Sequence, residues 1–177
     1  GEVAASMLLD IGCQWALVGH SERRALFGDT DQRVAEKASR ASGEGLRVML
    51  CVGETQAERE AGQTMDVVRR QLDAVLAISG SDILIQGAVA YEPVWAIGTG
   101  KTASPEQAQQ VHQILREHIA GEDSVVADAI RILYGGSVKD TNARELFSQP
   151  DIDGGLVGGS SLEARQFAAI CATMENV

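Results

Sequence analysis

The sequence predicts an α/β domain in which five short parallel strands alternate with helices. The first observation is a set of apolar runs of strand length, each followed by a turn or loop that begins with Gly, or with Pro close by. These runs are Trp15–Val18, Val48–Val52, Ala88–Tyr91, Ile130–Tyr134 and Ile152–Val157. The second observation is that helical patterns separate the runs, and this alternation favours a parallel sheet with helical crossovers. No Pro/Ser-rich linker divides the chain, so we expect residues 1–177 to form a single domain.

The helices between the strands carry their own sequence signals. Ser104, Pro105 and Gln107 form a helix start, because Ser can cap, Pro suits the first position and Gln completes a capping box. Two apolar stripes recur at helical spacing. Their residues are Val68, Leu72, Val75 and Leu76 in one helix and Phe167, Ile170, Cys171 and Met174 in another. The residues expected to be buried behind the Ser104 cap are Val111, Ile114, Leu115 and His118.

Composition and charge exclude several classes of protein. The net charge of −10 argues against nonspecific binding to nucleic acid or to anionic membranes. No apolar run approaches membrane-spanning length. Cys13, Cys51 and Cys171 are widely spaced and lack close metal-binding spacing, so we expect no metal site and a reducing compartment, the cytoplasm. The chain opens with Gly-Glu rather than with Met or a secretory signal, which is consistent with a cut edge.

Residues with catalytic or binding chemistry gather directly after the predicted strands. They are His20, Glu54, Glu92, Ser137, Gly158 and Gly159. In parallel α/β folds this edge of the sheet is where ligands bind. His20 can polarise a carbonyl or shuttle a proton, or it can simply cap a helix. Glu92, followed by Pro93-Val94-Trp95, is placed to be desolvated, which suits a general base, although a capping or ion-paired Glu is equally compatible. His112 and His118 lie in a helical segment and are interpreted as packing or surface residues.

Three Gly-containing loops are candidates for holding an anion. Ala96–Lys101 superficially resembles a nucleotide phosphate loop, but the required first Gly is replaced by Trp95. A short lid of small residues that closes over a ligand is the better interpretation. Tyr134–Ser137 and Val157–Ser160 each join a strand to a helix, where glycines let backbone N–H groups approach an anion. Tight turns without a ligand remain the alternative.

Taken together, these motifs resemble the triosephosphate isomerase family. The matching segments are Val18–Arg24, Leu50–Thr55, Ala90–Lys101, Tyr134–Ser137 and Gly155–Gly159. The resemblance implies a (β/α)8 barrel, present here as an incomplete barrel of five parallel units with a preceding helix near Glu2–Asp10. It also implies an aldose–ketose isomerase of glycolysis and gluconeogenesis that acts on a triose phosphate without a cofactor.

The resemblance assigns roles to individual positions. Glu92 would be the base, and neutral His20 would polarise the substrate carbonyl, with Ser21 and Glu22 supporting the site behind them. Backbone N–H groups of Gly98, Ser137, Gly158 and Gly159 would bind the phosphate group. The lid would comprise Pro93, Val94, Trp95, Ala96, Ile97, Thr99, Gly100 and Lys101, and its closure would exclude water.

The resemblance also defines what this stretch of sequence would lack. The first three units of the family's barrel would be absent, including a Lys that places positive charge near the substrate, and Lys101 in the lid does not replace it. The open edges near Trp15–Val18 and Ile152–Val157 would favour association, so we expect a homo-oligomer and weak isomerase activity from these residues alone. A catalytically inactive phosphate-binding module and an assembly fragment of the same family are the alternatives.

Overall fold

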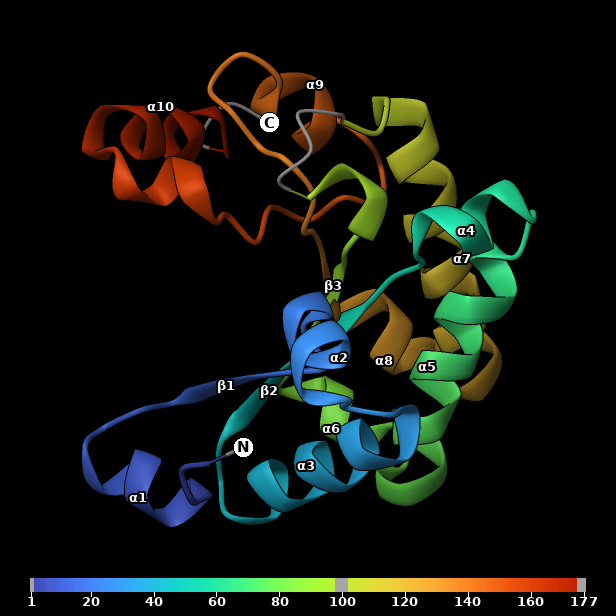
Figure 1. Cartoon of the computed structure of the whole chain (residues 1–177), viewed down its shortest axis with the longest axis vertical. Coiled ribbons are helices and arrows are strands. Elements are labelled where there is room, and N and C mark those ends of the chain that lie inside the picture. Colours follow the sequence, from blue (N-terminus) through green and yellow to red (C-terminus); the bar gives the residue numbers. More distant parts are fainter. Residues whose placement is uncertain (1, 98–101, 175–177) are drawn as a thin grey trace.

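Four parallel strands form one sheet in the order β1-β2-β3-β4. The computed structural model describes residues 2–97 and 102–174 (Figure 1). The strands are β1 (Trp15–Val18), β2 (Arg47–Val52), β3 (Ala88–Tyr91) and β4 (Arg131–Tyr134). Each pairs in parallel with its neighbour in the sequence, as the alternating pattern predicts. The bounds of β1 and β3 coincide with the predicted runs, and those of β2 and β4 differ by one residue at the start.

The predicted fifth strand is much shorter than expected. Within the predicted run from residue 152 to residue 157, only Gly155 forms a bridge, in parallel with Tyr134 at the end of β4. The backbone follows β4 on either side of this bridge, since Asp153 N donates to Ile132 O at 3.0 Å and Leu156 N donates to Tyr134 O at 2.9 Å. Gly154 has a φ of 151°, a conformation that interrupts an extended strand, and the Gly-Gly pair has little strand propensity.

Helices occupy the connections between the strands. They are α1 (Ala5–Asp10), α2 (Ser21–Phe27), α3 (Asp31–Gly43), α4 (Gln56–Glu60), α5 (Thr64–Ser79), α6 (Asp82–Ile85), α7 (Pro105–Glu122), α8 (Ser124–Ala129), α9 (Ala143–Phe147) and α10 (Ala164–Met174). Two short 3₁₀ segments, η1 (Val94–Ala96) and η2 (Gly159–Leu162), belong to loops after β3 and β4. The long helices α3, α5 and α7 pack in sequence along one side of the sheet (Figure 1). None of the described helices is long and apolar enough to cross a membrane.

The helix signals before α7 are confirmed, and its buried face is shifted. Ser104 caps the helix and forms the capping box with Gln107, and Pro105 occupies the first turn. The predicted Val111 and Leu115 are buried, but Ile114 and His118 are only partly covered. The positions that complete the buried stripe are Ala108, His112 and Ile119. The buried face of α7 is therefore rotated slightly from the predicted one. On α5 the stripe is as predicted, with Val68, Leu72 and Val75 fully buried and Leu76 packed against the core.

The apolar stripe of α10 is mostly exposed, contrary to expectation. Ile170 is buried, whereas Phe167 and Met174 are 41% and 40% exposed and Cys171 is also exposed. At the other end of the sheet, the outermost strand β1 leaves Leu17 51% exposed. Figure 1 shows α1 and α10 projecting away from the row formed by α5 and α7. The described part of the chain is thus an open α/β sheet with uncovered apolar surface at both ends.

Candidate active site

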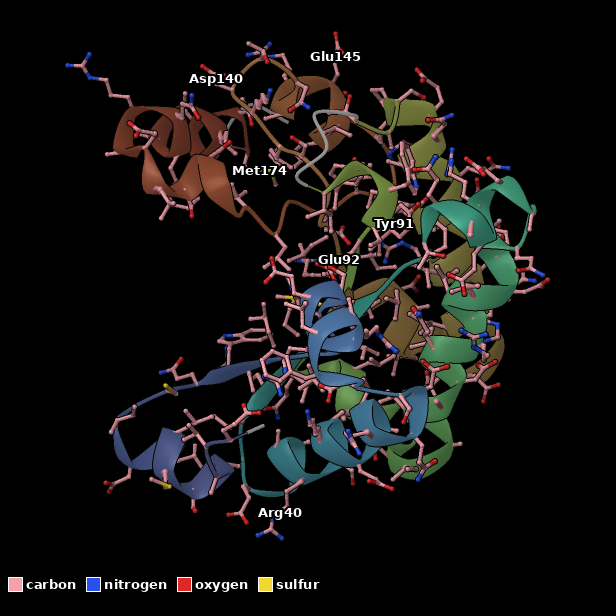
Figure 2. All side chains as sticks on the ribbon, in the orientation of Figure 1. Arg40, Tyr91, Glu92, Asp140, Glu145 and Met174 are labelled. Atoms are coloured by element: carbon pink, nitrogen blue, oxygen red, sulfur yellow. The ribbon has the colours of Figure 1, made fainter. Side chains whose placement is uncertain are left out.

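The carboxylate of Glu92 lies at the carboxyl end of the sheet against the start of α2. Glu92 follows β3 directly and is only 2% exposed (Figure 2). Its Oε1 lies 3.0 Å from His20 Nε2, and its Oε2 accepts a hydrogen bond from the backbone N–H of Ser21 at 2.9 Å. Cys51 packs beside it, and burial together with the Glu92 charge raises the pKa of the Cys51 thiol. The two residues proposed for catalysis, 72 positions apart, are therefore in direct contact.

His20 combines a capping role with this contact. It is the N-cap residue of α2, and its Nδ1 accepts a hydrogen bond from Glu22 N–H at 3.4 Å. A nitrogen that accepts carries no proton, so the neutral ring holds its proton on Nε2, facing Glu92. The hydrogen bond to Glu92 raises the pKa of His20, burial opposes the rise, and the charges of Glu92 and Glu22 add to it. The capping and catalytic interpretations of His20 are thus compatible with one geometry.

Glu54 connects the first residues of the predicted lid to the sheet. Its side chain is fully buried, and Oε1 accepts hydrogen bonds from Trp95 Nε1 at 2.9 Å and Tyr91 Oη at 3.2 Å. Arg59 adds an ion pair to the same oxygen at 3.3 Å and stacks its guanidinium 4.3 Å from the centre of the Trp95 ring. The backbone N–H of Val94 donates to Glu54 O at 3.2 Å. Polar contacts therefore hold the N-terminal end of the predicted lid.

The structure covers only part of the predicted lid and phosphate-binding set. Pro93, Val94, Trp95, Ala96 and Ile97 are described, and Val94–Ala96 form η1. The remaining predicted residues, Gly98, Thr99, Gly100 and Lys101, lie outside the described residues.

The two Gly-rich loops lie side by side, and one of them reaches Glu92. Ser160 Oγ donates to Val138 O at 2.8 Å, which joins the loop at Gly158 and Gly159 to the loop at Ser137. The loop at Ser137 also abuts Glu92, because a Cβ on Gly135 would lie 2.9 Å from Cγ of Glu92. The predicted residues Ser137, Gly158 and Gly159 thus belong to adjacent loops.

Comparisons with known proteins identify the family. Residues 1–174 match the family model described as triosephosphate isomerase. This chain belongs to the triosephosphate isomerase family. It is 61% identical over 171 residues to the triosephosphate isomerase of Thiobacillus denitrificans, covering 97% of this chain and 69% of that protein. The enzymes of Pseudomonas savastanoi pv. phaseolicola and Nitrosomonas europaea are 57% and 56% identical over 176 residues, covering 99% of this chain and 70% of each relative.

Membership in the triosephosphate isomerase family agrees with the fold and the enzyme class expected from the sequence motifs. The family fold is a (β/α)8 barrel, and the described parallel sheet with its helices is an incomplete barrel of that type. The chain spans about 70% of the length of these relatives. The chain is accordingly an isomerase by family.

Two polar side chains near the site were not singled out from the sequence. Arg59 pairs with Glu54 and Trp95, and its only sequence signal is a cationic residue shortly after the strand-end Glu54. Gln71 is buried on α5, and its signal is a polar residue one position before Leu72 within the apolar stripe. His112 was expected to be either a packing or a surface residue, and it is a packing residue of the core. Its Nδ1 lies 3.1 Å from Asp151 O, and burial lowers the pKa of His112 to about 4.

Proposed function

We propose that this chain interconverts dihydroxyacetone phosphate and glyceraldehyde 3-phosphate by proton transfer through an enediolate, with Glu92 as the base. The observation that carries the proposal is the buried contact between Glu92 Oε1 and His20 Nε2 at 3.0 Å. A carboxylate can take a proton from carbon while an adjacent imidazole N–H donates a hydrogen bond to the oxygen that gains charge. Both groups of the reaction therefore meet at one point.

The substrate has to separate this pair. In the structure Glu92 is hydrogen-bonded to Ser21 N and to His20, which leaves no room for substrate carbons between them. The backbone of Glu92 is held by a 2.7 Å hydrogen bond from its N–H to Val52 O. The motion that admits the substrate is therefore a rotation of the Glu92 side chain rather than a shift of the strand.

His20 acts as a neutral donor. The N–H of Glu22 occupies Nδ1, so a second proton on the ring would place two hydrogens against each other. Once Glu92 turns to the substrate, the Nε2–H of His20 is free to donate to the substrate carbonyl. Charge that develops on that oxygen is stabilised by a fixed donor in a site from which the closed lid, Pro93–Lys101, excludes water.

The phosphate group is proposed to bind the Gly-rich loops. Backbone N–H groups of Ser137, Gly158 and Gly159 are the donors, with Gly98 added from the lid. Gly159 begins η2, and a Cβ on Gly158 or Gly159 would meet no atom within 4 Å, so both backbones are open to a ligand. Open glycine N–H groups at a helical N-terminus favour an anion.

An isomerase assay tests the proposal. The chain is assayed alone and after mixing with a polypeptide that supplies the N-terminal units of a relative, beside Glu92→Gln and a control Glu117→Gln at an exposed position of α7. We expect weak turnover from the chain alone, stronger turnover in the mixture, loss of both in Glu92→Gln, and no change in the control. Equal turnover by the chain and Glu92→Gln would refute the role of Glu92.

We further propose that the chain associates with itself through its uncovered apolar ends. Support comes from β1, where Trp15 and Leu17 are 39% and 51% exposed, and from Phe167 on α10. Pairing such edges removes apolar surface from water, at about 25 cal/mol per Å². Sedimentation over a concentration series should show oligomers that Leu17→Lys weakens. A monomer at every concentration would refute association.

The setting we propose is glycolysis and gluconeogenesis in the cytoplasm. The three cysteines, Cys13, Cys51 and Cys171, are unpaired in the part of the chain that the structure describes, as expected in a reducing compartment.

A further inference from the structure

We propose that Gln71 is a positioning residue for Glu92, acting through the backbone of Gly53. This inference rests on the proposed function, in which Glu92 is the base. Gln71 does not touch Glu92 or the expected substrate position. Its side-chain amide forms two hydrogen bonds with the backbone of Gly53, and we call this pair of bonds the clamp. The backbone of Gly53 is in contact with the backbone of Glu92.

The first observation is a pair of hydrogen bonds between one side chain and one residue's backbone. Gln71 Oε1 accepts from Gly53 N–H at 2.7 Å, and Gln71 Nε2 donates to Gly53 O at 3.2 Å. Gln71 is only 5% exposed, and its neighbours on the buried face of α5, Val68 and Leu72, are fully buried and apolar. Burying an amide is costly unless its hydrogen bonds are made, and here both the donor and the acceptor are used.

The second observation is the close approach of Gly53 to Glu92. A Cβ on Gly53 would lie 1.7 Å from Glu92 O and 2.6 Å from Glu92 C, so the two backbones are in contact. The preceding residue, Val52, accepts the hydrogen bond from Glu92 N–H at 2.7 Å. Val52 and Gly53 together therefore hold the peptide groups on both sides of the catalytic carboxylate.

The position of Gly53 explains why a clamp is needed. β2 ends at Val52, so Gly53 is the first residue beyond the regular strand pairing. Its N–H and C=O groups are buried and would lose their partners without Gln71. A glycine in that situation has the widest choice of backbone conformations. By bonding both groups, Gln71 extends the order of the strand by one residue.

The consequence concerns the distance between Glu92 and His20. If Gly53 relaxes, the peptide of Glu92 loses its support and the carboxylate shifts relative to the imidazole and to the substrate. A misplacement of about 1 Å can cost roughly a hundredfold in rate. We expect loss of the clamp to lower kcat by about tenfold to a hundredfold and to change KM little, because the phosphate-binding loops do not depend on Gln71.

The test compares Gln71→Met, of similar size but without the amide, with Val75→Ala on the next turn of α5. Val75 is fully buried, so its truncation destabilises the core without removing a hydrogen bond. The readout is the NMR titration of His20, identified with His20→Gln, because the hydrogen bond from His20 to Glu92 raises the pKa of His20. Gln71→Asn, too short to make both bonds, is the second variant if the Met variant folds poorly.

We expect either Gln71 variant to bring the His20 pKa down toward its ordinary value of about 6.5 and Val75→Ala to leave it raised. A titration unchanged in a folded Gln71 variant would overturn the proposal, as would an equal change in Val75→Ala. If the wild-type enzyme, alone and complemented, shows no isomerase activity, the proposed function fails, and the His20 titration still decides whether Gln71 positions Glu92.

Discussion

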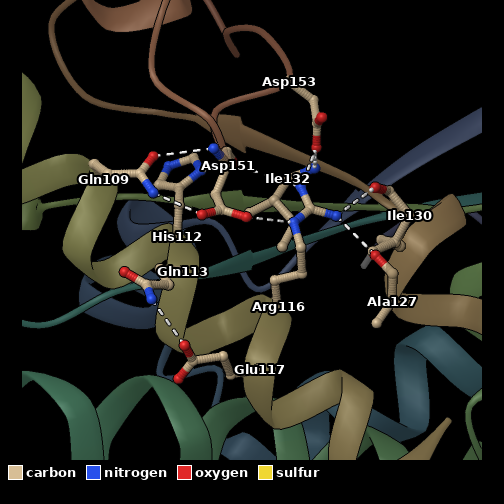
Figure 3. A network of polar contacts seen from close by, with 10 residues as sticks. All are labelled: Gln109, His112, Gln113, Arg116, Glu117, Ala127, Ile130, Ile132, Asp151 and Asp153. Atoms are coloured by element: carbon tan, nitrogen blue, oxygen red, sulfur yellow. Dashed lines mark hydrogen bonds and ion pairs between the residues drawn. The ribbon is translucent and has the colours of Figure 1, made fainter. Parts of the chain in front are cut away.

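Replacing Arg116 with Met is expected to lower the stability of the chain markedly. The guanidinium of Arg116 lies among two carboxylates and three backbone carbonyls that come from distant parts of the chain (Figure 3). Its Nε bonds Asp151 Oδ1 at 2.8 Å and its Nη2 bonds Asp153 Oδ2 at 2.7 Å. Its Nη1 donates to Ala127 O at 2.7 Å and to Ile130 O at 3.3 Å. Met removes these donors together.

The size of the effect follows from how little of this network is exposed. The side chains of Arg116, Asp151 and Asp153 are 20%, 18% and 22% exposed. Removing one partner of a buried pair costs about 3–5 kcal/mol, whereas exposed pairs contribute about 0–1 kcal/mol. Allowing for partial exposure, we expect about 3 kcal/mol. In a domain of this size about 1 kcal/mol shifts Tm by roughly 2–4 °C, so Tm should fall by about 6–12 °C.

Thermal unfolding followed by circular dichroism measures the change. Arg40→Met is the matched control, because Arg40 is 78% exposed and pairs with Glu44, the residue that follows α3. The control should change stability by less than about 0.5 kcal/mol. A second readout is the affinity for inorganic phosphate, since Arg116 holds Asp151 and Asp153, the residues that lead into the loop at Gly158. If Arg116→Met and Arg40→Met unfold at the same Tm, the network does not stabilise the fold as its geometry indicates.

Three further predictions concern the site itself. Glu92→Asp should keep phosphate-analogue binding and lower kcat about a hundredfold, because the shorter side chain misplaces the carboxylate; unchanged kcat in steady-state assays would contradict this. The hydrogen bond to Glu92 raises the pKa of His20, so the stabilisation from this pair is fully present below pH ~6.5 and is lost as the pH rises through the folded pKa. Urea unfolding at a series of pH values should show this loss of stability in the wild type and not in His20→Gln. Gly158→Val should fold, since its Cβ would meet no atom within 4 Å, yet weaken phosphate binding in calorimetry; unaltered affinity would exclude this loop from the phosphate site.

Local pattern was sufficient for the strands that have neighbours on the sheet. β1 and β3 coincide with apolar runs that end at Gly19 and Glu92-Pro93, since buried parallel strands need continuous apolar residues and their ends need turn residues. The run from residue 152 to residue 157 has Asp153, Gly154 and Gly155 between its apolar residues, and only Gly155 pairs. The conformation of Gly154 interrupts the strand there, and a search for apolar runs alone does not reveal it.

The burial of an apolar helix face was predictable only where neighbouring helices cover that face. The stripe on α5 lies between α3 and α7 and is buried, whereas the equally regular stripe of Phe167, Ile170 and Met174 on α10 remains largely exposed. Periodicity identifies which face of a helix is apolar, and the cover comes from tertiary structure. The same limit applies to polar partners. His20 and Glu92 could be expected near each other, because residues that follow parallel strands meet at one edge of the sheet. The pairing of Gln71 with Gly53 depends on the distance between α5 and the end of β2.

The contacts that order the candidate site are made where the strands end, at the carboxyl edge of the sheet. Glu54 and Gln71 act at the end of β2, Glu92 follows β3, and Gly135 at the end of β4 donates its N–H to Tyr91 O at 2.7 Å. Each of these contacts is made just past a strand, where regular pairing stops and a backbone would otherwise relax. Buried side-chain hydrogen bonds replace the missing pairing at these points. The proposed self-association uses the uncovered apolar surface at β1 and α10, whereas the positions of Glu92 and of the groups that support it depend on contacts at the strand ends.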